Sequence, residues 1–247
     1  MPSPPATASR RTARSDGVEA RHRLLYAALR LFAEKGFAKT STREIAQAAG
    51  TNVAAIRYYF GDKAGLYAAC FAEPLGGNAG DLIPFFEAPG LSLAESLHIF
   101  MTGYVEPLRR GEVVRQCMRL HMREMLEPTS QWLTELERDI KGPHEALVRI
   151  LCRHLKLAQA DDDVHRLAFA LAGLALQLFV TLDAVDAIKP SLLRTPRNID
   201  TWSDRLTRYA LALVAAEADR RREAQATRAA SRAPSTRAAA RSERQRT

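Results

Sequence analysis

The chain has 247 residues, enough for one large domain or for a small domain followed by a larger one, and 47% of them are hydrophobic. Aromatic residues are few, at 7%, whereas Ala, Leu and Arg are abundant, which predicts an all-α fold. The net charge of +8 arises entirely from residues 1–18 and 219–247, so the charge total alone is poor evidence for nucleic-acid binding.

The cysteines and the apolar runs indicate a cytoplasmic protein. Cys70, Cys117 and Cys152 are an odd number, far apart and without a C-x-x-C pair, which predicts free thiols in a reducing compartment. The N-terminus has arginines but no apolar core of a signal peptide. The most apolar run, Leu167–Val180, is too short to span a bilayer and contains Gln177, which predicts a buried helix and no membrane partner.

The N-terminal part begins with a segment that we expect to be unfolded. Residues 1–18 are rich in Pro, Ser, Ala and Arg, which predicts a disordered basic arm. Residues 19–35 follow as a first helix, because apolar residues recur at helical spacing between Leu25 and Phe32. Gly36 ends this helix.

Residues 41–60 predict two short helices joined by a tight turn. Ser41 and Glu44 form an S-x-x-E capping box at the start of the first of these helices. Gly50 ends that helix, and Asn52 caps the next one. This spacing is typical of a helix-turn-helix, whose second helix enters a DNA major groove.

A further helix, Lys63–Ala72, is predicted to start at the cap Asp62. Lys63 in its first turn opposes the helix dipole, which is favourable only if an anion such as a phosphate binds there. Residues 73–92 are rich in glycine and proline and mark a domain boundary or a mobile loop.

The remainder of the chain predicts a helical bundle, with no strand-like alternation and no internal repeat. The expected helices are at about 92–109, 112–126, 130–141, 143–159, 162–187 and 200–224. Pro107 is expected to kink or end the first of them. Residues 225–247, rich in Ala, Arg and Ser, predict a disordered basic tail.

Residues 24–71 resemble the DNA-binding domain of TetR-family transcriptional regulators. The resemblance is carried by five motifs in order: A-x-x-L-F-x-x-x-G-F (28–37), T-S-T-x-x-I-A (40–46), A-G (49–50), Y-Y-F (58–60) and K-x-x-L-Y (63–67). Val53 and Arg57 depart from the commonest family pattern at positions that face DNA in the family. The resemblance implies a sequence-specific regulator, but its operator cannot be transferred from other members.

The DNA-contacting residues are predicted from this resemblance and from side-chain chemistry. Arg57 is the expected base reader, because a guanidinium can bond guanine O6 and N7 together. Val53 and Ala55 can pack on a thymine methyl, and Asn52 can cap its helix, bind phosphate or do both. The remaining positions match family contacts to the DNA backbone, with core packing as the alternative for Tyr58: Ser41, Thr42, Arg43, Tyr58, Tyr59 and Lys63.

One reader helix covers few base pairs, so a homodimer on palindromic double-stranded operator DNA is expected. The resemblance places its interface on the last two long helices, with filling of the monomer core as the alternative. The predicted interface residues are Leu171, Leu174, Leu178, Trp202, Leu206 and Tyr209.

The C-terminal part resembles a TetR-family ligand-binding domain, and Cys117–Thr129 is similar to that of the CerR-type subgroup. Apolar and aromatic side chains on its helices are candidates for a small-molecule effector pocket, although such residues also simply fill cores. The predicted pocket residues are Phe100, Tyr104, Met118, His121, Met122, Met125, Trp132, Phe169 and Leu176.

A metal site and an enzyme are the weaker interpretations. Cys117, His121 and Glu124 share one helix face, but a single helix rarely supplies a whole coordination sphere, so a hydrogen-bonded histidine is favoured and no metal or cofactor is predicted. The acidic run 161–163 precedes a helix, whose dipole it satisfies. No common catalytic motif is present, so no catalytic residue is assigned.

The sequence therefore predicts a DNA-binding regulator, a repressor released from its operator by an effector. The predicted domains are a helix-turn-helix domain at 19–73 and a ligand-binding and dimerisation domain at 74–224, between the two basic ends. Two alternatives stay open: a non-specific nucleic-acid-binding protein that uses its arginine-rich ends, or a helical enzyme.

Overall fold

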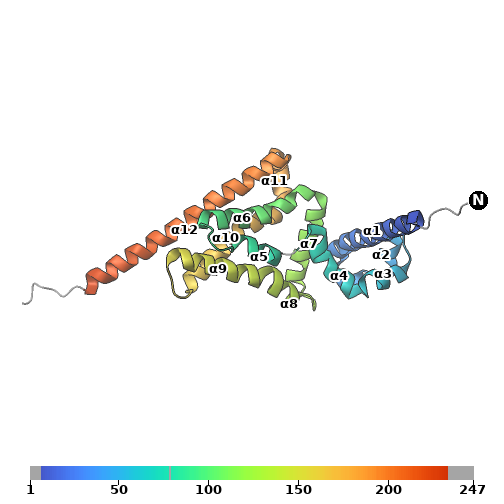
Figure 1. The fold of residues 1–247 in the computed structure, drawn as a ribbon, viewed down its shortest axis with the longest axis horizontal. Helices are drawn as coiled ribbons and strands as arrows, with labels where there is room; N and C mark the ends of the chain where they lie inside the picture. Colours follow the sequence, from blue (N-terminus) through green and yellow to red (C-terminus); the bar gives the residue numbers. More distant parts are fainter. Residues whose placement is uncertain (1–6, 78, 233–247) are drawn as a thin grey trace, which may run out of the picture.

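The computed structural model describes residues 7–77 and 79–232, which form helices and turns with no strand among them (Figure 1). The prediction of an all-α fold is confirmed. The α-helices are α1 (Thr7–Lys39), α2 (Thr42–Ala48), α3 (Val53–Phe60), α4 (Lys63–Ala72), α5 (Ile83–Phe86), α6 (Leu93–Val105), α7 (Glu112–Leu126), α8 (Trp132–Glu135), α9 (Gly142–Leu155), α10 (Asp162–Val180), α11 (Leu182–Ile188) and α12 (Pro196–Arg232). Between them lie short 3-10 turns at 73–75, 79–82, 106–110 and 190–192, and a π-helical turn at 136–141.

Helices α1 to α4 form a small domain at one end of the molecule (Figure 1). Its core is built from apolar residues of all four helices, among them Phe32, Ile45, Ile56 and Tyr67. The ring of Tyr67 packs edge-on against Phe32, with 4.9 Å between the ring centroids. This core fixes α3 relative to the rest of the domain.

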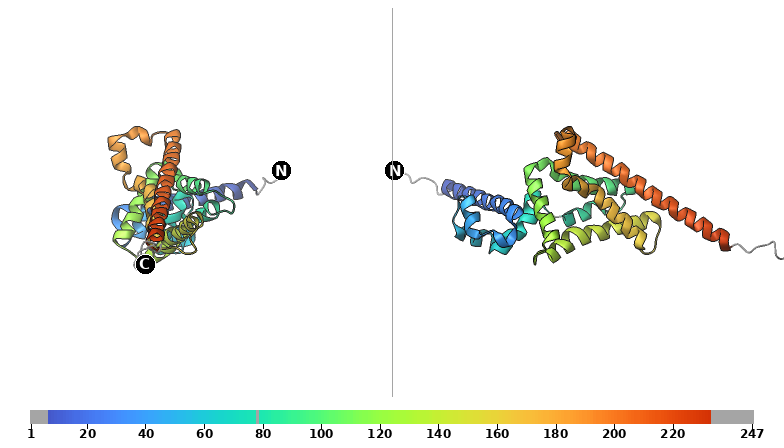
Figure 2. Two further views of the ribbon diagram at one scale, coloured as in Figure 1. Left: turned by 90° about the vertical axis from the view of Figure 1, so that its left-hand side faces the viewer. Right: turned by 180° about the vertical axis from the view of Figure 1, so that it is seen from behind.

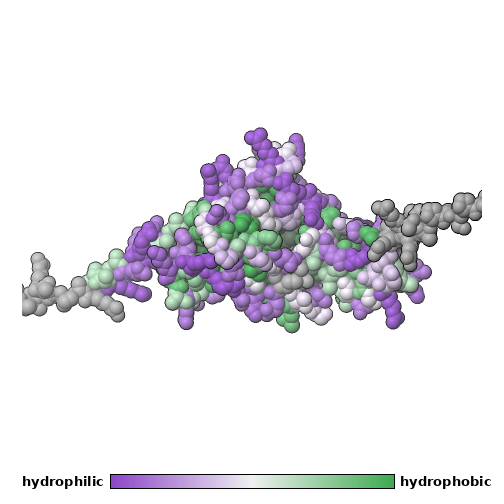
Figure 3. Space-filling view, in the orientation of Figure 1, coloured by the Kyte–Doolittle hydropathy of each residue, from purple (hydrophilic) through white to green (hydrophobic). Residues whose placement is uncertain are grey.

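The C-terminal domain is a bundle in which α12 packs mainly on α6 and also on α10, while α9 packs on α10 (Figures 1 and 2). Its core gathers buried side chains of these helices, such as Phe100, Leu147, Leu171 and Leu206. The C-terminal part of α12 leaves this body and carries largely hydrophilic side chains (Figure 3).

Helix α7 lies between the two domains and contributes to both cores (Figure 1). Cys117 and Leu120 belong to the core of the N-terminal domain. Val114, one turn before Cys117, belongs to the core of the C-terminal domain. The two domains therefore share one helix and are not joined by a linker alone.

The first and last helices are longer than predicted. Helix α1 begins at Thr7, so the expected disorder of residues 1–18 is wrong from that residue on. Helix α12 continues to Arg232, so the expected disorder of residues 225–247 is wrong up to that residue. The residues before 7 and after 232 lie outside the described residues. Both extensions are rich in Ala and Arg, which are strong helix formers, and this propensity outweighs the compositional signal of disorder.

Two predicted helix limits inside the C-terminal domain are also corrected. The helix predicted at 162–187 is interrupted at Thr181, whose hydroxyl donates to the Gln177 carbonyl (2.7 Å). A threonine bonded back to the preceding turn competes with regular helix geometry. Helix α9 ends at Leu155 and not near residue 159, because Lys156 takes the left-handed conformation (φ 56°).

Helix α10 has the length and hydropathy of a membrane span, alone among the described helices. Its inner residues, such as Ala168, Leu171 and Ala175, are fully buried in the C-terminal core. One face of the helix is therefore a core element, as the sequence predicted, but the expected burial of the whole helix is wrong, because Phe169, Leu176 and Val180 are exposed.

A buried carboxylate connects α7 to the N-terminal domain. Glu124 on α7 is only 1% exposed. One of its oxygens accepts a hydrogen bond from the Tyr67 hydroxyl (2.7 Å). The other oxygen accepts bonds from the backbone N–H and the hydroxyl of Thr129, both at 2.7 Å. Burial, first, and the Glu124 carboxylate raise the pKa of Tyr67 well above its usual value, so its hydroxyl keeps its proton.

Replacing Tyr67 by Phe should lower the free energy of unfolding by about 1–3 kcal/mol, because a buried acceptor then loses a donor. Urea denaturation followed by circular dichroism measures this change. The control Tyr26→Phe removes a hydroxyl from a tyrosine that is 40% exposed, and it should leave the midpoint unchanged. Equal midpoints for both variants would show that the Tyr67–Glu124 bond does not stabilise the fold.

Candidate DNA interface and effector cavity

The helix-turn-helix has the geometry that the sequence predicted. The Ser41 hydroxyl accepts from the Glu44 N–H (3.1 Å) and caps α2. The Asn52 side-chain oxygen accepts from the Ala54 N–H (3.0 Å) and caps α3. Gly50 in the turn has φ 61°, a conformation that glycine adopts without strain. The Glu44 carboxylate, the other side chain of the predicted capping box, pairs with Lys35, and this bond and, to a lesser degree, a bond from the Ser41 backbone lower its pKa.

Helix α3 presents one apolar face to the core and one mixed face to solvent. Ile56 is buried, while Val53 is 41% and Tyr58 82% exposed. Arg57 is also exposed and makes no ion pair with any described residue. Core packing of Tyr58, the alternative at this position, is therefore wrong. Ala55 is half-buried and packs against the domain core.

The positions predicted to contact the DNA backbone divide into exposed and supporting residues. Ser41 and Arg43 are exposed at the start of α2, next to the half-buried Thr42. Tyr59 is half-buried, and its hydroxyl lies 3.3 Å from the point where a Cβ of residue 17 would be, so it packs on α1 at Gly17. We interpret Tyr59 as a residue that holds α1 against α3.

Lys63 begins α4 directly after the cap Asp62, whose side chain accepts from the Gly65 N–H (2.8 Å). Its ammonium lies 4.3 Å from the centroid of the Phe37 ring. Partial burial lowers the pKa of Lys63. The cation is thus held on an aromatic face, a partner that the sequence did not reveal.

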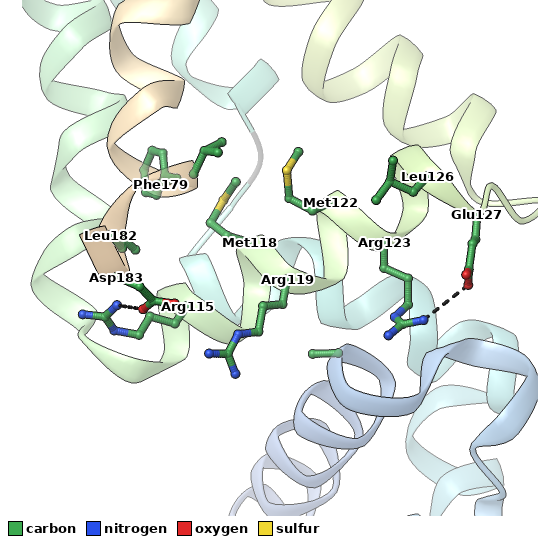
Figure 4. Close-up of a pocket in the computed structure, with 12 residues that line it drawn as sticks. Arg115, Met118, Arg119, Met122, Arg123, Leu126, Glu127, Phe179, Leu182 and Asp183 are labelled. Atoms are coloured by element: carbon green, nitrogen blue, oxygen red, sulfur yellow. Dashed lines mark hydrogen bonds and ion pairs between the residues drawn. The ribbon is translucent and has the colours of Figure 1, made fainter. Parts of the chain in front are cut away.

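A cavity of about 500 Å³ opens where α1, α7 and the corner between α10 and α11 meet (Figure 4). Its apolar wall combines side chains of α7 with side chains of that corner. Arg115, Arg119 and Arg123 of α7 form its cationic edge. The apolar lining residues are Ala33, Met118, Met122, Leu126, Phe179, Val180 and Leu182.

Only two of the nine predicted pocket residues, Met118 and Met122, line this cavity. Phe100 and Tyr104 instead pack together in the C-terminal domain, with ring centroids 4.8 Å apart. Burial raises the pKa of Tyr104 to about 12. Three others point away from the protein interior and are exposed: Met125, Phe169 and Leu176.

Comparisons with known proteins agree with this geometry. A family model described as "Bacterial regulatory proteins, tetR family" matches residues 24–70. A second model, the C-terminal domain of the HTH-type transcriptional dual regulator CecR, matches residues 93–217, just over half of the chain.

This chain belongs to the TetR family of transcriptional regulators. Its C-terminal domain is of the CecR type, so CecR and not CerR is the name of the subgroup that Cys117–Thr129 resembles.

The HTH-type transcriptional dual regulator CecR of Shigella flexneri is 32% identical over 145 residues, 55% of this chain and 64% of the relative. The HTH-type transcriptional regulator AcrR of the same organism is 35% identical over 106 residues, 40% of this chain and 49% of the relative. The matches thus span less than two thirds of either relative. The crystal structure of the TetR-family regulator PfmR from Thermus thermophilus has the same fold, with a TM-score of 0.55 and 18% identity over 78% of this chain and 97% of that one.

The predicted dimer residues of this TetR-family regulator prove to be divided between core and surface. Leu171, Leu178 and Leu206 are buried within the chain, so their assignment to an interface is wrong. Leu174 and Trp202 are half-buried and pack on the same core, and the Trp202 ring N–H donates to the Leu192 carbonyl (3.1 Å). Tyr209 is exposed and stays a candidate. Helical spacing did not distinguish the buried side of these helices from the side that faces outward.

The suggested metal ligands of this TetR-family regulator are engaged elsewhere. Nδ1 of His121 lies 2.8 Å from the Cys117 carbonyl oxygen, and its ring packs on Phe71 with centroids 5.0 Å apart. Glu124 binds Tyr67 and Thr129. Burial raises the pKa of Cys117 to about 12. In the described part of the chain, no three potential ligands come together.

Two structural contacts of this TetR-family regulator were not predicted from the sequence. Arg21 of α1 forms a bidentate ion pair with Glu73 (2.6 and 2.7 Å) and lies over the Phe60 ring. Arg123 of α7 donates to the Glu34 carbonyl of α1 (3.2 Å). Both join residues more than fifty positions apart, so local sequence spacing held no signal for them.

Proposed function

We propose that this TetR-family regulator is a sequence-specific repressor that binds a palindromic operator as a homodimer and is released by a small-molecule effector. The supporting observation is the solvent-facing side of α3. Val53, Arg57 and Tyr58 are exposed to solvent on this side of the domain. Arg57 makes no ion pair with any described residue. An unpaired guanidinium on a reader helix suits guanine recognition.

An exposed apolar stripe on α10 supports the proposed dimer. Phe169 (60% exposed), Leu176 (42%) and Val180 (61%) lie on the outward face of this helix, with Gly173 between them, and Val180 at the end of this stripe also lines the cavity beside α7. Tyr209 and Leu213 are exposed on α12, which packs beside α10. Contiguous exposed apolar patches on soluble proteins often mark interaction sites. A second copy would cover them by isologous packing about a two-fold axis.

The shared helix α7 supports coupling between effector and DNA. Because α7 belongs to both cores, a ligand that shifts it also displaces α1 and α4, and hence the spacing of two reader helices in a dimer. Allosteric coupling is typically about 1–3 kcal/mol and is reciprocal, so operator DNA should weaken effector binding by the same factor.

The alternative of non-specific binding through the arginine-rich end loses support from the ion pairs of α12. Arg221 forms a bidentate pair with Asp161 (2.7 and 2.8 Å), and Arg220 pairs with Asp163 (2.7 Å). These arginines stabilise the start of α10. We place the regulator in the cytoplasm, where its free thiols stay reduced.

Selection of bound sequences from a random duplex library, at near-physiological salt, tests the proposed function. The full chain should enrich a palindrome, and its half-site spacing gives the separation of the two α3 helices. If no sequence is enriched and binding collapses steeply as salt rises, the specific-regulator proposal is wrong.

Arg57→Ala should relax specificity at one position of each half-site by about 1–3 kcal/mol, because a bidentate base contact is lost. Arg43→Ala removes a charge from the backbone-contacting edge and should weaken binding to all sequences alike. Binding measurements on single-position operator variants separate these results. An unchanged preference profile for Arg57→Ala would refute its role as a base reader.

Leu176→Glu should convert the dimer to a monomer at micromolar concentration, because it places a charge in the centre of the α10 stripe. Sedimentation velocity measures the oligomeric state. The matched control is Leu133→Glu, at an exposed leucine of α8 outside the stripe. If Leu176→Glu stays dimeric, another surface forms the interface.

A further inference from the structure

The cavity beside α7 has two parallel rows of side chains with different chemistry (Figure 4). Met118, Met122 and Leu126 are four residues apart, so they form an apolar row about 12 Å long on a helix that rises 1.5 Å per residue. Figure 4 shows Met118 and Met122 on the side of Phe179 and the arginines along the opposite edge. Arg115, Arg119 and Arg123 repeat the same spacing.

The arginines of this row differ in what neutralises them. Arg115 is paired with Asp183 (2.6 Å) and with Asp186, both on α11. Arg123 is paired with Glu127 (3.3 Å). Arg119, between them, is exposed and has no ion pair with any described residue. The acidic residues of the cavity wall are thus engaged by the outer two arginines, and the middle guanidinium is free for an anion.

Arg123 also connects the cavity to the DNA-binding domain. Besides pairing with Glu127, its guanidinium donates to the Glu34 carbonyl (3.2 Å) of α1, two residues before the kink at Gly36. A Cβ at Gly36, where α1 leaves helical geometry (φ 80°), would lie 3.3 Å from the Arg123 side chain. The Nε atom of Arg123 is buried without an acceptor. One donor of the guanidinium is therefore unsatisfied while Arg123 is in contact with α1.

We propose that this cavity binds a small, elongated amphipathic carboxylate, with Arg119 as the carboxylate-binding residue and Arg123 as the link between occupancy and α1. The apolar row accepts the body of the ligand, and methionines adapt to flexible chains. A guanidinium suits a carboxylate because it offers two parallel donors. A carboxylate beside Arg119 also lies one turn from Arg123, where it competes with the Glu34 carbonyl and loosens the contact between α7 and α1.

This inference rests on the proposed function and adds the class of effector. Its test uses octanoate, whose extended chain fits the apolar row, and octan-1-ol, which has the same chain without the charge. Isothermal titration calorimetry of the full chain should detect binding of octanoate. The affinity for octan-1-ol should be at least tenfold weaker. Arg119→Gln should weaken octanoate binding at least tenfold. Arg208→Gln, at an exposed arginine of α12 outside the cavity, should leave octanoate binding unchanged.

Equal octanoate affinity of the Arg119 and Arg208 variants, or equal affinity for octanoate and octan-1-ol, would overturn the site. Thermal melting checks that both variants are folded. Sedimentation checks that Arg119→Gln keeps the oligomeric state of the parent chain. A monomeric Arg119→Gln variant would assign the cavity to the subunit interface and also overturn the proposal.

The coupling step is tested with the DNA selected above. Octanoate should weaken operator binding of the parent chain, and Arg123→Gln should reduce this effect while octanoate still binds. Binding of the operator without octanoate is measured separately. If the chain binds operator but octanoate leaves that binding unchanged, the inference fails while the proposed function stands. If no operator is bound in the absence of octanoate, the proposed function itself fails.

Discussion

The architecture depends on the placement of one helix, α7, in two hydrophobic cores. Cys117 and Leu120 fill space in the N-terminal core, and Val114 fills space in the C-terminal core. Protein interiors are packed as densely as organic crystals, so a rotation of α7 cannot be absorbed by empty volume on either side. The buried Glu124 also fixes the orientation of α7, because its hydrogen bonds to Tyr67 and Thr129 form only in a defined geometry. The two domains are thereby held in one relative position.

The role of each charged residue in this protein depends on its position more than on the net charge of the chain. The whole positive excess lies in residues 1–18 and 219–247, yet Arg220 and Arg221 stabilise the fold by pairing with the start of α10. The hydrogen bond from Arg221 is the main cause that holds the pKa of Asp161 well below its usual range. The cations available to partners are isolated ones, such as Arg57 on α3 and Arg119 beside α7, which no described neighbour neutralises.

Local features such as helix caps were predictable from the sequence, whereas the tertiary packing of the helices was not. Ser41, Asn52 and Asp62 cap their helices as expected, because a cap depends on residues two or three positions away. The outward side of α10 was not predictable, because Leu171 and Leu176 are equally apolar and only the placement of α6, α9 and α12 decides which one is buried. The cavity was not predictable from the sequence for the same reason. It joins α7 to Phe179 and Leu182, about sixty residues further along the chain, and no local pattern reports such a contact.

The lysine at the start of α4 stands at one end of a continuous series of contacts. Its ammonium rests on Phe37, Phe37 packs against Tyr67 with ring centroids 4.9 Å apart, and the Tyr67 hydroxyl binds Glu124 of α7. A free lysine side chain loses about 1.5–2 kcal/mol of rotamer entropy when it is immobilised. Lys63 has given up part of this freedom before any phosphate arrives, so it is preorganised, and a contact with DNA at this position would carry a smaller entropic penalty. A displacement of α7 that disturbs the aromatic stack would return that freedom to the lysine and make the same contact weaker without removing any charge.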